Sequence, residues 1–203
     1  MTSGEGDAGT AGLQELFTEG RWTHEPSDVV RDGDHVVVTA AEGSDAWRHT
    51  SYGFVHDSEH ALIAPFGSSE AIEVSFLLDY VAQFDQAGIF LRASEEHWIK
   101  AGVEAADGAP QVGAVVTHGT SDWSAAPVPE WVGRIVTIRA SREGDAVTVR
   151  ARVENEPWRL VRVAHLDAGA IVEAGLFCAA PTRAGLRVTF TGYRRGPADE
   201  SLH

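Results

Sequence analysis

The sequence has few cysteines, few basic residues and no long apolar run. One cysteine occurs among 203 residues, so no intramolecular disulfide can form. Sixteen lysines and arginines oppose 30 aspartates and glutamates, which gives a net charge of −14. This charge disfavours binding to nucleic acids and to anionic membrane surfaces. No segment approaches the roughly 18 consecutive apolar residues that a membrane-spanning helix needs.

The N-terminal segment lacks the features of a secretory signal peptide. It has no basic start and no apolar core, and we therefore expect a cytoplasmic protein. Residues 1–20 are acidic and rich in glycine, and their few large apolar side chains lie at 13–17. We expect these residues to form a flexible segment with at most one helical turn.

Several signatures of catalysis and metal binding are also absent. The sequence contains no H-E-x-x-H, no pair of cysteines, no G-x-S-x-G and no P-loop motif. Nine histidines are scattered along the chain, and no loop has the dense aspartates of an EF-hand. We therefore expect neither a cofactor nor a metal site.

From Arg21 onward the pattern is that of β-strands. Short runs rich in Val, Ile, Phe, Trp and Thr alternate with Gly, Pro, Asp and Ser, and no helical period of ten residues appears. We expect residues 21–203 to form a single all-β domain, a sandwich or jelly roll. The clearest predicted strands cover residues 35–40, 61–65, 71–80, 88–93, 97–105, 111–118, 132–141, 146–153, 158–166, 172–179 and 186–191.

Alternation within these strands predicts which side chains share a face. In the strand over 97–105, Trp98, Lys100 and Glu104 alternate with apolar side chains, so they point to the opposite face. In the strand over 158–166 both alternating sets are partly apolar. That pattern predicts a central strand that is covered on both sides.

Four blocks of unusual composition occur in order along the chain. They read W-R-H-T-S-Y-G-F over residues 47–54, F-D-Q-A-G over 84–88, W-I-K-A-G-V-E over 98–104 and V-V-T-H-G-T-S-D-W-S over 115–124. Together they resemble the DUF1349 family, whose fungal members are called regulation of enolase proteins, and the resemblance covers about residues 21–192. It implies a concanavalin A-like jelly-roll β-sandwich of two curved antiparallel sheets, similar to the C-terminal sandwich of some β-xylosidases. A structural calcium ion, which such folds can hold, remains an open alternative.

The resemblance also implies that the polar face around Lys100 is the concave one. An aromatic ring there can stack on a pyranose, while amide, ammonium and carboxylate groups bond its hydroxyls. We therefore predict a site for a carbohydrate or a sugar-like metabolite. The predicted ligand-binding residues are Trp47, Tyr52, Gln86, Trp98, Lys100, Glu104, Asp122 and Trp123.

A purely structural interpretation of the same residues remains open. Gln86, Lys100 and Glu104 would then form a solvated outer face with cross-strand ion pairs. Residues 121–124 would form a tight loop, and the aromatic side chains of 47–54 would pack at a corner of the sandwich.

An enzyme acting on a small sugar or glycoside is the alternative function. A glycosidase needs two carboxylates about 5–5.5 Å or 6.5–9.5 Å apart. The carboxylates considered are Glu104, Asp85, Asp122, Asp45 and Glu25. An isomerase would abstract a proton with Lys100 or Glu104, so the candidate catalytic residues are Glu104, Lys100 and Asp85. A protein-interaction or regulatory module is a further alternative, which predicts an exposed apolar patch and no deep cleft.

Overall fold

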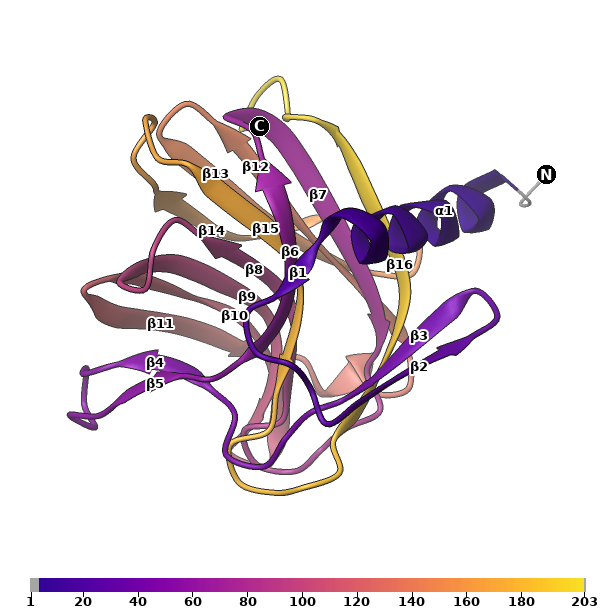
Figure 1. The fold of residues 1–203 in the computed structure, drawn as a ribbon, viewed down its shortest axis with the longest axis vertical. Helices are drawn as coiled ribbons and strands as arrows, with labels where there is room; N and C mark the ends of the chain where they lie inside the picture. The colour runs from indigo at the N-terminus through magenta and orange to yellow at the C-terminus, as the bar shows by residue number, and fades with distance from the viewer. Residues whose placement is uncertain (1–3, 203) are drawn as a thin grey trace.

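The computed structural model describes residues 4–202, and its strands form two seven-stranded sheets that face each other (Figure 1). The first sheet has the order β1 (Arg21–Trp22), β6 (His60–Phe66), β15 (Val172–Ala179), β8 (Gln86–Arg92), β9 (His97–Ala106), β10 (Ala109–His118) and β11 (Thr120–Pro127). The second sheet has the order β14 (Arg159–His165), β13 (Ala146–Val153), β12 (Ile135–Glu143), β7 (Ser69–Leu77), β16 (Arg187–Pro197), β3 (His35–Thr39) and β2 (Asp28–Asp32). All neighbouring strands in both sheets are antiparallel. The predicted fold class is confirmed.

Three smaller elements complete the described chain. A hairpin of β4 (Ala46–Arg48) and β5 (Val55–Asp57) belongs to neither sheet and lies beside the first one (Figure 1). A single turn of 3-10 helix, η1 (Pro129–Trp131), precedes β12. The helix α1 (Gly4–Glu19) lies across the molecule from the hairpin. No helix among residues 4–202 is long and apolar enough to cross a membrane.

The core lies between the two sheets and follows from side-chain alternation. In β13, Val147, Val149 and Ala151 are buried, whereas the residues between them are half-buried. Phe76 and Phe190 from neighbouring strands meet edge to face in this core, with ring centroids 6.3 Å apart. Each buried apolar side chain of this size contributes about 1.5–3 kcal/mol to folding.

The helix α1 differs from the prediction of a flexible segment over residues 1–20. Leu13 and Leu16 are buried in the main core, because their spacing of three places both on one face of a helix. Gly12 lets the helix approach β16 closely, since a Cβ there would lie 2.0 Å from the carbonyl oxygen of Tyr193. The flexible-segment prediction is therefore wrong for the part of the helix that packs on the sheets. Residues 1–3 of the predicted segment, and His203 of the predicted domain, lie outside the described residues.

Each of the eleven predicted strands corresponds to a strand of the structure, but the predicted position of one of them within its sheet is wrong. The strand over 158–166 is β14, an edge strand of the second sheet and not a central one. Its apolar residues Leu160 and Val163 are exposed. The strands that the sequence did not predict are β1, β2, β4, β5 and β11, which are short or lie at an edge, where burial imposes little apolar alternation.

If the helix is part of the folded core, Leu16→Ala is expected to lower the free energy of unfolding by about 2–5 kcal/mol, because it leaves a cavity between helix and sheet. Leu160→Ala on the edge strand is the matched control, and a change below about 0.5 kcal/mol is expected there. Urea unfolding of the two variants measures both values. Equal losses would contradict the docking of the helix.

Candidate functional site

A row of polar side chains crosses the outer face of the first sheet, the face that points away from the second sheet. Gln86 of β8 and Gln111 of β10 lie directly opposite Glu104 of β9 in the strand register. Ala101 and Val103 of β9 belong to the core between the sheets. Because side chains alternate along a strand, the three polar residues therefore face outward together.

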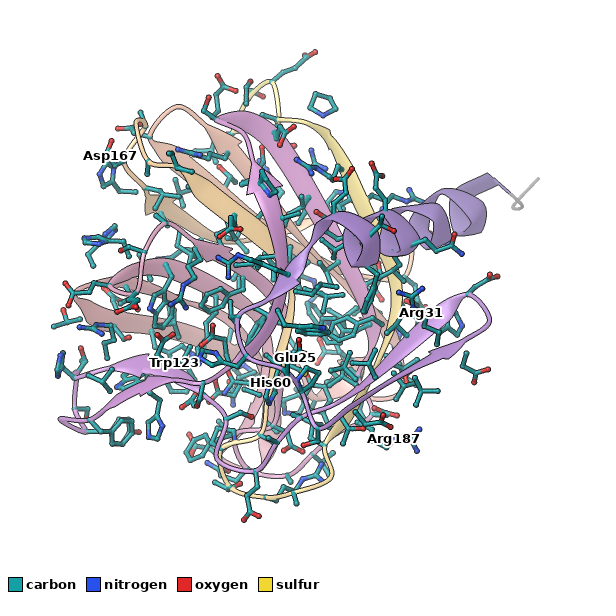
Figure 2. All side chains as sticks on the ribbon, in the orientation of Figure 1. Glu25, Arg31, His60, Trp123, Asp167 and Arg187 are labelled. Atoms are coloured by element: carbon teal, nitrogen blue, oxygen red, sulfur yellow. The ribbon has the colours of Figure 1, made fainter. Side chains whose placement is uncertain are left out.

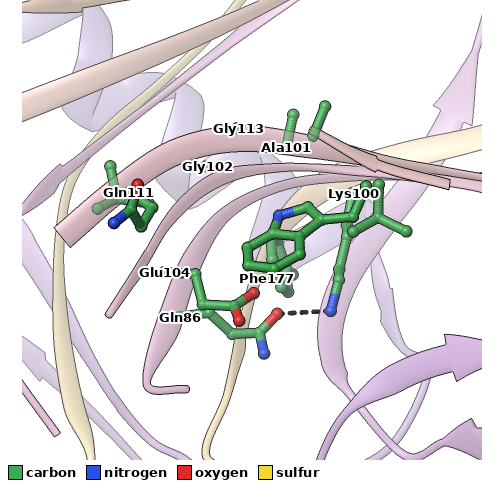
Figure 3. A pocket seen from close by; sticks show the side chains of 12 residues that line it. Gln86, Lys100, Ala101, Gly102, Glu104, Gln111, Gly113 and Phe177 are labelled. Atoms are coloured by element: carbon green, nitrogen blue, oxygen red, sulfur yellow. Dashed lines mark hydrogen bonds between the residues drawn. The ribbon is translucent and has the colours of Figure 1, made fainter. Parts of the chain in front are cut away.

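A row of glycines runs next to this polar row. Gly88, Gly102 and Gly113 are paired across β8, β9 and β10, and the last two are labelled in Figure 3. A Cβ added to Gly102 would lie 2.0 Å from the carbonyl oxygen of Ala87, so a side chain cannot be accommodated here without moving the strands. The sheet therefore presents bare backbone beside the polar side chains, and a ligand can approach it closely.

Lys100 is the only lysine of the chain, and its side chain is buried on this outer face. Its Nζ donates to Oε1 of Gln86 at 2.8 Å (Figure 3) and to Oδ1 of Asp45 at 3.1 Å. Nε2 of Gln86 donates to the same oxygen of Asp45 at 3.2 Å. A buried ammonium is stable only with such a counter-charge. The network therefore joins Asp45, the residue before β4, to strands β8 and β9 of the first sheet.

Glu104 lies beside this network, and no hydrogen bond from another described residue reaches its carboxyl group. Burial raises the pKa of Glu104 to about 7, against the opposing charge of the Lys100 ammonium and with a further increase from the Asp45 carboxylate. A carboxyl that titrates near neutral pH can take up or release a proton. Of the two predicted catalytic carboxyls, Glu104 and Asp85, only Glu104 lies beside this network.

The β4–β5 hairpin supplies an aromatic wall opposite these polar groups. Trp47 and Tyr52 meet edge to face with ring centroids 5.8 Å apart, and Tyr52 stacks on Phe54 at 5.3 Å. Phe54 in turn meets His56 at 4.5 Å. Nε1 of Trp47 donates to the carbonyl oxygen of Thr50 at 2.9 Å, which fixes the indole. The wall is thus a continuous series of rings.

Arg48 fastens the hairpin to the far edge of the sheet. Its backbone N–H donates to Oγ of Ser121 at 2.9 Å, and its Nε donates to the carbonyl oxygen of Gly119 at 3.1 Å. Its Nη2 pairs with Glu96 at 2.7 Å. The aromatic wall is therefore held on the sheet by charged and backbone contacts as well as by packing.

A cavity of about 310 Å³, here called the hairpin cavity, lies between the wall and the sheet. A volume of this size is at the lower end of the range for small-ligand pockets, about 300–1,000 Å³. Its lining residues are Gly43, Asp45, Trp47, Tyr52, Phe54, His56, Phe84, Gln86, Lys100, Glu104, Trp123, Pro181 and Thr182. Six of the eight predicted ligand-binding residues are among them, and Trp98 and Asp122 are not.

Trp98, which was expected to stack on a sugar, lies beneath the hairpin. It is 2 % exposed and stacks on Phe90 with ring centroids 5.4 Å apart. Together with Phe177 and Ala46 it forms a small apolar cluster on the outer face. A ligand cannot reach the indole, so the predicted stacking role is wrong.

Two further acidic candidates also lie outside the hairpin cavity. Asp85 is fully buried and accepts a hydrogen bond from Nε of Arg183 at 2.9 Å. Asp122 lies opposite Val116, a core residue, and its Oδ1 is 3.3 Å from Arg162 of the second sheet. The strand alternation therefore turns Asp122 away from the cavity while Trp123 faces it. The structure therefore does not bring Asp85 or Asp122 to the hairpin cavity with the other predicted residues.

Glu25 is exposed and lies near His60 (Figure 2), and it does not line the hairpin cavity. By contrast, Asp45 does line it, as a candidate carboxylate and as the first residue of the polar and aromatic stretch 45–52. Phe54, His56 and Phe84 were not predicted at all. One signal in the sequence could have found part of this set. Phe54 and His56 lie two residues apart, Phe54 immediately before β5 and His56 within it.

The fold and the cavity define a concanavalin A-like β-sandwich with a polar and aromatic cleft on the outer face of one sheet. The family model described as protein of unknown function (DUF1349) matches residues 22–198, and the chain therefore belongs to this family. It is 34% identical to Regulation of enolase protein 1 of Saccharomyces cerevisiae over 188 residues. This alignment covers 92% of this chain and 94% of the yeast protein.

Solved structures share the same architecture. The crystal structure of a functionally unknown protein from Saccharomyces cerevisiae matches with a TM-score of 0.84 and 32% identity, over 90% of this chain and 98% of that one. A xylan β-1,4-xylosidase from Bacillus halodurans C-125 matches with a TM-score of 0.65 and 13% identity, over 81% of this chain and 33% of the xylosidase. The second similarity shows a common fold and no more.

The raised pKa of Glu104 predicts how stability changes with pH. Its folded-state pKa of about 7 exceeds the ordinary value of 4.5. The protonated carboxyl therefore contributes stability below pH 4.5, and this contribution is lost as the pH rises through 7. Relative to wild type, Glu104→Gln is expected to gain up to about 3 kcal/mol of unfolding free energy between roughly pH 5 and pH 8.

Urea unfolding at a series of pH values measures this difference. Asp122→Asn is the matched control, because it removes an exposed carboxylate outside the cavity, and its curve is expected to run parallel to that of wild type. A parallel curve for Glu104→Gln as well would show that Glu104 does not carry the shifted pKa.

Proposed function

We propose that the chain binds an uncharged carbohydrate or sugar-like metabolite in the hairpin cavity. The observation that carries this proposal is the pairing of an aromatic wall with a hydrogen-bonding floor in one cavity of about 310 Å³. Sugars combine apolar ring faces with a rim of hydroxyls, so they need both kinds of surface.

Two other aromatic residues can provide the stacking surface that the buried Trp98 cannot. Tyr52 is 60 % exposed and Trp123 is 41 % exposed, and both line the cavity. Aromatic side chains of this kind offer a flat apolar face together with a polar tip. The proposed stacking surface for a sugar ring is therefore formed by Tyr52 and Trp123.

The floor supports recognition of hydroxyl groups. An ammonium has three N–H donors, and those of Lys100 bond to Gln86 and Asp45, which leaves one for a ligand oxygen. The carboxyl group of Glu104 and the bare backbone at Gly102 lie beside it. Together they offer donors and acceptors to neighbouring hydroxyls.

The charge of the site favours an uncharged ligand. The Lys100 ammonium is matched by the carboxylate of Asp45 at 3.1 Å, and Glu104 adds negative charge as the pH rises through about 7. A sugar acid would bring a further negative charge into this low-dielectric cavity. Because the chain has a net charge of −14, the proposal includes neither a nucleic-acid nor a membrane partner. The proposed localisation is the cytoplasm.

A thermal-shift screen against neutral sugars and sugar acids tests this proposal. A ligand at one hundred times its Kd stabilises the folded state by about 2.7 kcal/mol, so a neutral binder is expected to raise Tm clearly and its uronic acid less. Because Lys100 is the only lysine, ¹³Cε-lysine labelling gives one side-chain resonance, which the same ligand is expected to shift. Stronger binding of the acids would contradict the charge argument.

Variants then assign the binding to this cavity. Tyr52→Ala is expected to weaken binding at least about fivefold through loss of stacking, and Lys100→Met about tenfold or more through loss of a charged hydrogen bond. Asp122→Asn is the control and is expected to bind as wild type does. Since Tyr52 is exposed, its removal tests the cavity even if Lys100→Met unfolds. Unchanged binding by Tyr52→Ala would place the ligand elsewhere.

Proton transfer on the bound sugar is the second candidate function, and Glu104 is the observation that favours it. A general base works best with a pKa close to the operating pH, and that of Glu104 is raised to about 7. A hydrolase would need a second free carboxylate, whereas Asp45 is bound to Lys100. An isomerisation or other proton abstraction therefore fits better than hydrolysis.

This candidate has its own readout. Wild-type protein in D₂O is expected to exchange a carbon-bound proton of the bound sugar, and Glu104→Gln to bind the sugar without exchange. NMR of the sugar measures both its binding and the exchange of its carbon-bound proton. If wild type binds the sugar without exchange, the proton-transfer function is excluded and the binding function stands. If no sugar binds at all, the name of the yeast relative, Regulation of enolase protein 1, favours a protein partner at the exposed aromatic wall.

A further inference from the structure

A second polar cluster lies at the base of the hairpin, where β5 ends and β6 begins. His24, Asp57 and Glu59 each offer one potential metal-ligand atom, and these atoms all lie within 4.8 Å of one another. Ligand atoms bound to zinc through bonds of about 2.0–2.2 Å are closer still, so side-chain shifts on the order of 1 Å would let the three residues share an ion.

Glu59 is the buried member of this cluster, with 0 % of its surface exposed. Its Oε1 accepts a hydrogen bond from Nη1 of Arg92 at 3.3 Å. Its Oε2 is buried and has no hydrogen-bond partner among the described residues. A buried carboxylate oxygen without a partner costs about 1–3 kcal/mol or more. It is therefore a free acceptor in a place where acceptors are normally satisfied.

Arg92 compensates the acidic residues only in part. Its guanidinium bonds both oxygens of Asp57, at 2.8 Å and 3.1 Å, in addition to Oε1 of Glu59. When Glu59 is ionised, two carboxylates against one guanidinium leave one negative charge. Each carboxylate oxygen has two lone pairs, so the bonds to Arg92 do not exhaust Asp57 as a ligand. The cluster thus retains both charge and acceptor sites for a cation.

The position of His24 favours metal binding over a simple ion pair. Its Nδ1 lies 3.1 Å from the backbone carbonyl oxygen of Glu59. A carbonyl oxygen can only accept, so Nδ1 carries the proton and the lone pair of the neutral ring is on Nε2. A metal-binding histidine is held in this way, with its other nitrogen donating to a carbonyl or carboxylate.

A cavity beside the cluster opens it to solvent. This cavity has a volume of about 670 Å³, and His24, Asp57 and Arg92 are among its lining residues. An ion could enter by this route and keep water as its remaining ligand. Three protein ligands and one open position form the usual arrangement of an exchangeable zinc site.

We propose that His24, Asp57 and Glu59 bind one divalent transition-metal ion of the zinc class. The imidazole distinguishes this class from calcium and magnesium, which prefer oxygen ligands alone. The site goes beyond the proposed sugar cavity and does not depend on it. A divalent ion would more than offset the single negative charge that Arg92 leaves uncompensated.

Titration of the full chain with Zn²⁺ after removal of metals by a chelator tests the proposal. Isothermal calorimetry is expected to show one equivalent bound, with the affinity lowered by more than about 100-fold in Glu59→Gln and in His24→Ala. Co²⁺ in place of Zn²⁺ is expected to give visible absorption bands that both variants lose. Ca²⁺ and Mg²⁺ are expected to compete only weakly.

His118→Ala is the matched control, because His118 belongs to the exposed group of His97, His118 and His165, which could also attract zinc. This variant is expected to bind as wild type does, and so is Glu104→Gln in the hairpin cavity. Loss of binding in His118→Ala with retention in His24→Ala would overturn the assignment. Absence of one-equivalent binding by folded wild type would overturn it as well. His24→Ala is decisive even if Glu59→Gln does not fold, since His24 is partly exposed.

Discussion

A buried ammonium must have its counter-charge within hydrogen-bonding distance, and this constraint on Lys100 organises the outer face of the first sheet. The counter-charge is Asp45, at 3.1 Å, which lies in the chain just before β4. The sheet can therefore bury Lys100 only with the hairpin folded over it. Loss of one partner from a buried pair costs about 3–5 kcal/mol, so the hairpin cannot lift away cheaply. The cavity between hairpin and sheet follows from this one pair.

The hairpin also explains why the first sheet is apolar on both faces. Its inner face carries the main core, and its outer face carries Phe90, Trp98 and Phe177, which would be exposed in an uncovered sheet. The hairpin covers this second cluster with Ala46 and Trp47. The polar row around Glu104 and the glycine row remain outside the covered area. The outer face is thus divided into a dry part that fixes the hairpin and a polar part that forms the floor of the cavity.

The sequence predicted those features that depend on local alternation. The period of two in β9 alone predicts that Lys100 and Glu104 lie on one face. It could not show that Trp98 on the same face is covered, because the covering hairpin comes from a distant part of the sequence. The sequence could not show that Asp85 is buried in an ion pair either, because its partner Arg183 lies 98 residues away. The helix α1 was missed because its burial depends on contact with β16 and not on its own composition.

The segments by which the chain enters and leaves the hairpin are held in the same manner. Asp45 before β4 pairs with Lys100, and Asp57 at the end of β5 pairs with Arg92, both on the outer face. Beside each pair lies a carboxyl group whose charge is not fully compensated, Glu104 beside the Asp45–Lys100 pair and Glu59 beside the Asp57–Arg92 pair. Burial raises the pKa of both to about 7, which is a cost to the folded state at higher pH. Structural anchoring needs only the two ion pairs, so the anchoring of the hairpin does not account for the two additional carboxyls. Buried carboxyls with shifted pKa values of this kind are typical of functional sites, and this supports the two proposals.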